Sequence, residues 1–320
     1  MRKCREEYKE VSIEKLMSAF QSIQHGTDWS LQLLRITTPR GGSTKYASRQ
    51  ITLEPANQLD SFVHSIAARY LGTDKWAISK RTSVMEYDGT TDSKIVYKLQ
   101  SDHELISEEY SAFICAVSTP DVEADSMTFT SAYVIKGSTI VGDEDLPIKL
   151  VSMQNPVTTL KHKYAFCRDS GKFQELNEKV LNLRPTVDIV IIGSTVYFLT
   201  MNGENLFNME RAYKAVCHTS IETVESTGLV SGIETFKVVA GSGHNPRRFV
   251  SFNNERLEAL KNTRTRKAMA KQFNIPLDAD GKFDATVDGA AERIVKMLCN
   301  KGMVDPFKNA PVEVSGAKPW

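Results

Sequence analysis

The feature that most constrains the fold is a pair of apolar runs near the middle of the chain. Residues 187–192 and 196–200 are rich in β-branched and aromatic side chains, and Gly193-Ser194 lies between them. Two such runs joined by a two-residue turn predict a β-hairpin. The chain has 320 residues, of which 41% are hydrophobic. It is therefore long enough and apolar enough to bury a sizeable core around such a hairpin.

Hydrophobic periodicity predicts further elements on both sides of the hairpin. Helices are expected over 13–23, 56–71, 173–183, 206–216, 254–273 and 290–298. Strands are expected over 31–37, 95–99, 113–117, 127–135, 148–153 and 236–240. This order predicts an α+β protein with mixed sheets and flanking helices, in two sub-domains. Asn155-Pro156 is the expected boundary, which gives an N-terminal α+β domain over 1–155 and an α/β domain over 156–320.

The sequence favours a cytoplasmic protein. Its basic start, Arg2-Lys3, has no apolar stretch behind it, as a secretory signal would. No run approaches the roughly 18 apolar residues that a membrane span needs. The cysteines are odd in number and follow no repeated spacing, which favours free thiols in a reducing compartment over a disulfide framework. They are Cys4, Cys115, Cys167, Cys217 and Cys299.

Charge is distributed unevenly, although the net charge is only +1. The segment from Ser101 to Asp125 has seven acidic residues and no lysine or arginine: Asp102, Glu104, Glu108, Glu109, Asp121, Glu123 and Asp125. The segment from Arg247 to Lys271 has eight basic residues against Glu255 and Glu258: Arg247, Arg248, Arg256, Lys261, Arg264, Arg266, Lys267 and Lys271. Because phosphates attract clustered cations, these eight residues are the candidate nucleic-acid site.

One continuous helix, capped by Asn253 or Asn254, would align part of this basic segment. At 100° per residue, four of its cations fall within an arc of about 80°. They are Arg256, Arg264, Lys267 and Lys271, with Lys261 at the margin and Arg247-Arg248 in the preceding loop. Residues 262–265 are a poor helix interior, and a break there would remove the arc. The alternative is a solvated helix whose charges pair with the acidic segment.

No catalytic or metal-binding signature accompanies the basic segment, and no cofactor is expected. The histidines and cysteines form neither C-x-x-C nor H-E-x-x-H. Gly241-Ser242-Gly243 follows a predicted strand, but Pro246 replaces the third glycine of a dinucleotide loop, so a flexible turn is favoured. Asp278–Gly281 fails the register of a calcium loop and is expected to be a turn. Cys217-His218 are neighbours in sequence, which does not orient a nucleophile and a base together.

A metal-dependent nuclease is the enzymatic alternative. Asp92-Ser93-Lys94 precedes the strand at 95–99, and Asp74 or Asp88 would supply a second carboxylate. Two carboxylates and a lysine can hold Mg²⁺ and orient water. Triplets of this kind arise by chance in most chains of this size, so binding is favoured over cleavage.

The second half of the sequence resembles a bacterial defence family. The resemblance is carried by Asp188–Ile192, Val196–Leu199, Asn205–Phe207, Arg211–Tyr213, His244–Pro246, Asn254–Leu257 and Asp280–Phe283. Together these segments are similar to the KwaB family, the soluble subunits of the Kiwa anti-phage system, over residues 160–298. The resemblance implies a cytoplasmic homodimer that binds double-stranded DNA with little sequence preference. It also implies a KwaA-like multi-pass membrane partner that recruits the protein to the inner membrane, and it brings no catalytic residue.

The favoured interpretation is therefore a DNA-binding defence protein whose contacts lie between Arg247 and Lys271. The acidic segment is expected to face the basic cytoplasmic loops of the membrane partner, since such loops carry an excess of lysine and arginine. The alternatives are the Mg²⁺-dependent nuclease and a protein–protein adaptor that does not contact nucleic acid.

Overall fold

The computed structural model describes residues 13–25, 28–39, 42–55, 57–90, 92–123, 125–159, 166–169, 172–175, 179–300, 302–305 and 310–313. By its internal contacts the chain divides into two compact units. Unit 1 comprises Met1–Glu86 and Ser93–Asn208, and unit 2 comprises Tyr87–Asp92 and Met209–Trp320. Each unit is described by itself.

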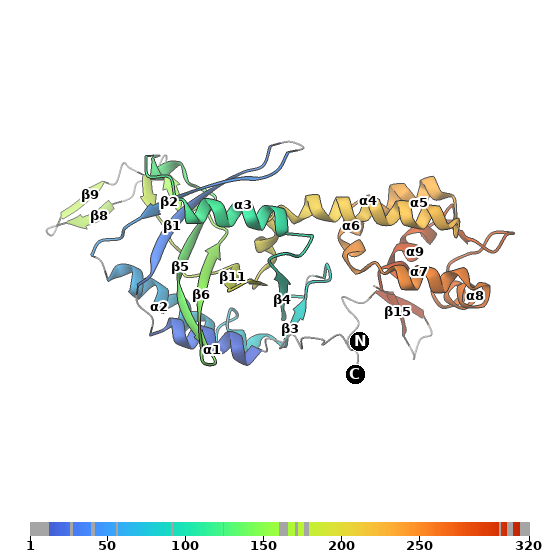
Figure 1. Ribbon diagram of the computed structural model, residues 1–320, viewed down its shortest axis with the longest axis horizontal. Helices are drawn as coiled ribbons and strands as arrows, with labels where there is room; N and C mark the ends of the chain where they lie inside the picture. Colours follow the sequence, from blue (N-terminus) through green and yellow to red (C-terminus); the bar gives the residue numbers. More distant parts are fainter. Residues whose placement is uncertain are drawn as a thin grey trace, which may run out of the picture. The chain divides into compact units, whose positions relative to one another are not determined.

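Unit 1 is built on an eight-stranded sheet with the order β2-β1-β5-β6-β11-β12-β4-β3 (Figure 1). All neighbours are antiparallel except β3 and β4, which run parallel. The strands are β1 (Ser30–Thr37), β2 (Lys45–Ile51), β3 (Ser83–Glu86), β4 (Ile95–Gln100), β5 (Ala132–Val141), β6 (Glu144–Ser152), β11 (Ile189–Ile192) and β12 (Thr195–Phe198). The predicted α+β class with a mixed sheet and flanking helices is confirmed.

The predicted hairpin is confirmed as β11 and β12, which pair antiparallel from Ile189↔Phe198 to Ile192↔Thr195. All four residues of β11 are buried, as expected for a strand covered on both faces. The hairpin lies in the middle of the sheet, because β11 pairs with β6 and β12 pairs with β4. The predicted boundary at Asn155-Pro156 thus falls inside unit 1, whereas the two units divide after Asn208.

One face of the sheet is covered by α1 (Ile13–Ile23) and α2 (Gln58–Leu71), with the short 3-10 helix η1 (Ile78–Lys80) beside them. α1 buries Leu16, Ala19, Phe20 and Ile23, the spacing of one helical face. Phe20 stacks on Tyr70 of α2 with ring centroids 5.0 Å apart. These contacts form the main apolar core of unit 1.

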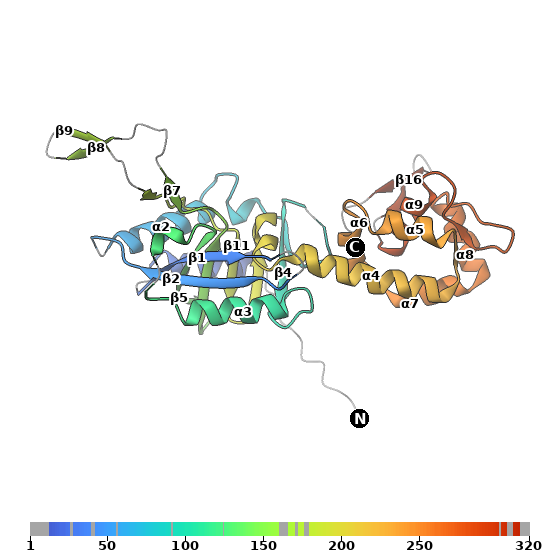
Figure 2. The same ribbon diagram turned by 90° about the horizontal axis from the view of Figure 1, so that it is seen from above.

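The opposite face carries α3 (Ser107–Ser118), and Figure 2 shows α2 and α3 on opposite sides of the strands. The strand predicted over 113–117 is wrong, because these residues are helical. Phe113 and Val117 are buried one turn apart, and Phe113 packs edge-on against Phe207. Glu109, Phe113 and Val117 are buried at intervals of four residues, as on one face of a helix. This spacing determines the structure, although the short run at 113–117 contains β-branched residues.

The region after β6 contains two small strand pairs. β7 (Val157–Thr159) pairs with β10 (Lys179–Leu181), and β8 (Phe166–Asp169) pairs with β9 (Lys172–Glu175). The helix predicted over 173–183 is therefore wrong. The strand β10 forms because it pairs with β7, about 20 residues earlier in the chain. The periodicity of a short sequence window does not contain information about such pairing.

Unit 2 is mainly helical. Its helices are α4 (Met209–Thr227), α5 (Ile233–Ala240), α6 (Asn245–Arg248), α7 (Asn254–Lys261), α8 (Thr263–Gln272) and α9 (Ala290–Leu298). Short strands form the pairs β13 (Val230–Ser231) with β14 (Phe283–Asp284), and β15 (Gly302–Asp305) with β16 (Ala310–Glu313). α9 confirms the prediction over 290–298 and contributes Ile294 and Val295 to the core.

The strand predicted over 236–240 is wrong, because these residues form the second half of α5. Gly232 precedes this helix with φ +68°, a left-handed conformation that favours glycine. Phe236 and Ala240 are both buried and lie one turn apart, so they face the core together. α5 packs against α9, so the valine-rich segment buries its apolar face as a helix.

Candidate nucleic-acid interface

The basic segment forms two helices, not one. Asn253 caps α7 by accepting a hydrogen bond from the Glu255 backbone N–H at 2.6 Å. Asn262 lies in extended backbone after α7 and caps α8, because its Oδ1 accepts from the N–H groups of Arg264 (2.9 Å) and Thr265 (3.2 Å). The continuous helix is therefore wrong, and so is the arc that aligned Arg256 with the cations of α8. The physical reason is the second asparagine cap.

Three exposed cations remain aligned on α8. Arg264, Lys267 and Lys271 are spaced i, i+3, i+7 and are all exposed, which places them on one face of the helix. Within the described part of the chain none of the three makes an ion pair or a side-chain hydrogen bond. α8 contains no acidic residue, and its buried side is marked by Ala270. This row, the α8 cationic row, spans about 10 Å along the helix axis.

The first residue of the α8 cationic row does not serve the stability of the helix, whereas Lys271 lies in the last turn, where the helix dipole favours a cation. Arg264 occupies the second position of α8, where the positive end of the helix dipole disfavours a cation. Thr263 and Thr265 add low helix propensity to the same turn. A residue that stabilised this turn would be acidic, so helix stability does not explain the arginine at position 264.

Arg266 lies on the other side of α8 and belongs to the fold. Its Nε donates to the Gly281 carbonyl oxygen at 2.7 Å, and its Nη1 donates to the Leu260 carbonyl oxygen at 3.0 Å. The guanidinium therefore satisfies a carbonyl at the end of α7 and fixes the turn that contains Gly281. That turn, Asp278–Gly281, is confirmed: Asp278 Oδ1 accepts from the N–H groups of Asp280 and Lys282, and the Lys282 contact lowers the pKa of Asp278.

Arg247 is enclosed by two tyrosines of unit 2. Its guanidinium carbon lies 5.8 Å from the ring centroid of Tyr87 and 5.7 Å from that of Tyr213. The two rings stack at an interplanar angle of 9°, and their hydroxyls are 2.5 Å apart. A Cβ on Gly89 would lie 2.3 Å from the Arg247 carbonyl oxygen, and the φ of Gly89 is +81°. Arg247 thus helps to hold Tyr87 and Gly89 in unit 2.

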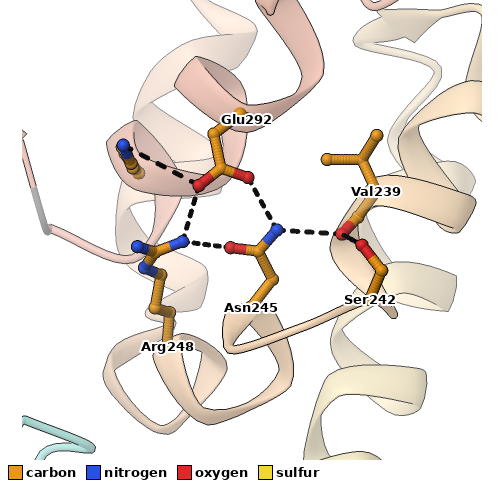
Figure 3. A network of polar contacts seen from close by, with 6 residues as sticks. Val239, Ser242, Asn245, Arg248 and Glu292 are labelled. Carbon is orange, nitrogen blue, oxygen red and sulfur yellow. Dashed lines mark hydrogen bonds and ion pairs between the residues drawn. The ribbon is translucent and has the colours of Figure 1, made fainter.

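Arg248 belongs to a partly buried polar network (Figure 3). Its Nη1 lies 2.6 Å from Glu292 Oε1 and also donates to Asn245 Oδ1. Buried Asn245 donates its Nδ2 to Glu292 Oε2 at 2.7 Å and to the Val239 carbonyl oxygen at 2.9 Å. Lys296 approaches the same carboxylate at 3.7 Å. The network ties α5, α6 and α9 together, so Arg248 is engaged inside the fold.

The other predicted cations lie on α7. Lys261 pairs with Glu258 at 2.7 Å, and the Arg256 Nη1 donates to the Ser251 carbonyl oxygen at 3.4 Å. Of the eight predicted residues, the structure thus aligns Arg264, Lys267 and Lys271 and gives the other five partners within unit 2. Sequence reasoning did not connect Tyr87, Tyr213, Asn245 and Glu292 with the arginines of the basic segment, because each finds its partners only in the folded chain.

The glycine and cysteine candidates also have structural roles. Gly241 caps α5 and therefore follows a helix, which removes the strand that a dinucleotide loop requires. The Cys217 thiol is buried and donates to the Ala240 carbonyl oxygen at 3.5 Å, and burial raises its pKa to about 11. His218 Nδ1 lies 3.4 Å from Glu222. Both residues line a hollow of about 350 Å³ beside α4.

Two carboxylates of the nuclease alternative, Asp74 and Asp88, make local contacts in the fold. Asp74 pairs with Arg69 at 3.4 Å and caps the Trp76 backbone N–H. Asp88 accepts from the Thr90 N–H at 3.0 Å. Across the residues that the structure describes, no group of three or more histidine, cysteine, aspartate or glutamate side chains could hold a metal ion.

The acidic segment lies in unit 1, around α3. Glu109 is buried and accepts from the Thr44 N–H at 3.3 Å and the Tyr46 hydroxyl at 3.2 Å. The remaining six acids are exposed. Asp102, Glu104 and Glu108 lie at or before the start of α3, where carboxylates favour the helix dipole. Asp121, Glu123 and Asp125 follow its end.

Comparison with known proteins gives one family. Residues 149–304 match the model of the family described as Kiwa protein KwaB-like. The match begins in β6 and ends in β15, so it includes the central hairpin, all of α4–α9 and the α8 cationic row. No curated protein and no solved structure shows significant similarity to the chain. In the described ranges, no helix is long and apolar enough to cross a membrane.

Proposed function

We propose that this chain, whose residues 149–304 match the KwaB-like family of Kiwa proteins, acts in anti-phage defence by binding double-stranded DNA through the α8 cationic row. The observation that carries the proposal is the row itself: Arg264, Lys267 and Lys271 share one exposed helix face and make no ion pair within the described residues. Lysine and arginine contacts to phosphate are independent of base sequence, so little sequence preference is expected.

The first experiment is an electrophoretic shift of duplex DNA with and without Mg²⁺. Wild type is compared with a variant that carries Arg264→Gln, Lys267→Gln and Lys271→Gln. The matched control replaces three exposed lysines of unit 1 by Gln: Lys45, Lys75 and Lys80. Both variants lose the same charge. The proposal expects intact shifted DNA with wild type and control, and a binding loss on the order of 10²-fold at 0.1 M salt with the α8 variant.

Three results would contradict this proposal. Equal losses in the α8 variant and the control would mean that net charge, not the row, governs binding. Cleavage of the plasmid in Mg²⁺ that is abolished by Asp92→Asn would establish the nuclease alternative. Absence of any shift at low salt would leave the adaptor, in which α8 binds an acidic protein surface.

We propose further that the acidic segment contacts the basic cytoplasmic loops of a KwaA-like membrane partner. Support comes from the six exposed carboxylates near the two ends of α3. Asp102→Asn, Glu104→Gln and Glu108→Gln together are expected to abolish co-purification with the partner without weakening DNA binding. Buried Glu109 is left unchanged, because it bonds within unit 1. Unchanged co-purification would exclude this surface.

The proposal also includes a homodimer. Sedimentation of the purified chain at several concentrations tests it directly. A single species with the mass of one 35.8 kDa chain at all concentrations would contradict it.

A further inference from the structure

Two lysines lie side by side on the α3 face of the unit 1 sheet. Lys136 of β5 and Lys149 of β6 are directly opposite each other in the antiparallel register. Side chains in such positions have Cβ atoms about 5 Å apart. The Lys136 ammonium donates to the Val117 carbonyl oxygen of α3 at 3.1 Å, which fixes the face that both lysines occupy. Figure 1 shows α3 passing β5 and β6.

Neither lysine has a carboxylate partner within the described residues. The Lys136 contact is to a carbonyl oxygen, and Lys149 makes no side-chain hydrogen bond or ion pair there. Burial lowers the pKa of both ammonium groups, and the charge of Lys136 lowers that of Lys149 further. Like charges placed directly opposite on neighbouring strands destabilise a sheet. The fold therefore keeps two partly desolvated cations together without an anion from this part of the chain.

A purely structural role accounts for at most one of them. Lys136 could serve to satisfy the end of α3, but Gln32 Nε2 already donates to the same Val117 oxygen at 3.1 Å. Lys149 has no such role. The Gln32 side chain is fully buried, and its Oε1 has no hydrogen-bond partner among the described residues. That oxygen is an acceptor that lacks a donor, so what an anion would complete is the pair of ammonium groups of Lys136 and Lys149.

We infer that Lys136 and Lys149 bind the phosphate group of a small-molecule ligand on this face of unit 1. Phosphate is the expected chemistry because a single dianionic group can neutralise two adjacent ammonium groups, and lysine binds phosphate as a point charge. The inference does not rest on DNA binding, since it concerns residues of unit 1 and makes no use of α8. The phosphate source is either inorganic phosphate or a nucleotide.

Isothermal titration with inorganic phosphate and, separately, with ATP tests the inference in the full-length chain. Wild type is compared with Lys149→Met, with Lys136→Met/Lys149→Met, and with Lys45→Met, which removes an exposed lysine of β2. Wild type and Lys45→Met should bind at least one of the two ligands, and Lys149→Met should lose tenfold or more in affinity. Tighter binding of ATP would identify a nucleotide, and equal binding would identify the phosphate group alone.

Thermal unfolding without ligand distinguishes a binding role from a structural one. Because Lys149→Met removes a like-charge contact, its melting temperature should equal or exceed that of wild type, and phosphate or ATP should no longer raise it. A large fall in melting temperature would overturn the inference, because Lys149 would then be structural. Unchanged ligand affinity in the double variant would also overturn it. If neither ligand binds wild type and the double variant instead weakens DNA binding, the pair belongs to a DNA surface and the inference fails.

Discussion

The acidic segment of unit 1 and the basic segment of unit 2 have opposite charge, and the fold uses them to different extents. In the acidic segment one carboxylate, Glu109, is buried and bonded, and the other six are exposed. In the basic segment most cations have partners in unit 2, and the α8 cationic row is what remains aligned and exposed. A charge count along the sequence therefore overstates the basic surface far more than the acidic one. The reason is that arginine can satisfy several carbonyl and carboxylate oxygens inside a fold.

The largest expected effect on stability is in the polar network of unit 2. Glu292→Ala removes one ion-pair partner of Arg248 and one acceptor of buried Asn245. Because Glu292 is partly exposed, the expected loss is about 2–3 kcal/mol in the free energy of unfolding. Urea denaturation measures it. An unchanged unfolding midpoint would show that Arg248 is not held by the fold and is available to DNA.

Arg266 and Arg264 lie on the same helix, so substitutions of the two residues can be compared directly. Arg266→Gln removes charged hydrogen bonds to the Gly281 and Leu260 carbonyl oxygens and should destabilise by about 1.5–3 kcal/mol. Arg264→Gln should change stability by less than about 0.5 kcal/mol. The same denaturation experiment compares them. Equal destabilisation would remove the distinction between the cations used by the fold and the α8 cationic row.

The buried Glu109 and the exposed Glu108 allow the same comparison in unit 1. Glu109→Ala leaves the buried Thr44 N–H without its side-chain acceptor, whereas the Tyr46 hydroxyl keeps the Leu206 carbonyl oxygen as its other acceptor, so the expected cost is about 1–3 kcal/mol. Glu108→Ala removes an exposed carboxylate and should cost less than about 1 kcal/mol. If Glu109→Ala were instead neutral in urea denaturation, the acidic segment would be wholly a surface feature.

The smallest expected effect is a slight gain in stability that accompanies a loss of DNA affinity. Arg264→Glu places an acid at the second position of α8, where the helix dipole favours it by about 0.3–1 kcal/mol. The variant should therefore be slightly more stable than wild type and bind DNA more weakly. Thermal unfolding and DNA titration of one preparation measure both. A variant that is more stable and binds DNA as well as wild type would exclude Arg264 from the site.

Local sequence patterns predict the parts of the fold that depend on local spacing. The helices at 13–23 and 290–298 and the central hairpin are confirmed because their periods match their buried faces. The runs at 113–117 and 236–240 are apolar and β-branched, yet each lies in a helix that packs against its unit. Their conformation was decided by tertiary contacts, which a five-residue window does not contain.

The candidate site was predictable in part. The sequence identifies the basic segment and the weak helix interior at 262–265, and the structure places the helix break there. It does not separate Arg264 from Arg266, because the acceptors of Arg266 include Gly281, 15 residues further along the chain. Nor does it pair Tyr87 with Tyr213, which are 126 residues apart. The division of cations between fold and surface is a property of the folded unit.

The most direct test of the central claim is the salt dependence of DNA affinity for wild type and for the Arg264→Gln, Lys267→Gln, Lys271→Gln variant. Each phosphate contact contributes about 0.9 to the slope of log affinity against log salt concentration, so three contacts in one chain contribute about 2.7. We expect the variant to lose a slope of this size while its melting temperature stays within a few degrees of wild type. A variant with an unchanged slope would contradict the account, because the phosphate contacts would then lie outside the α8 cationic row.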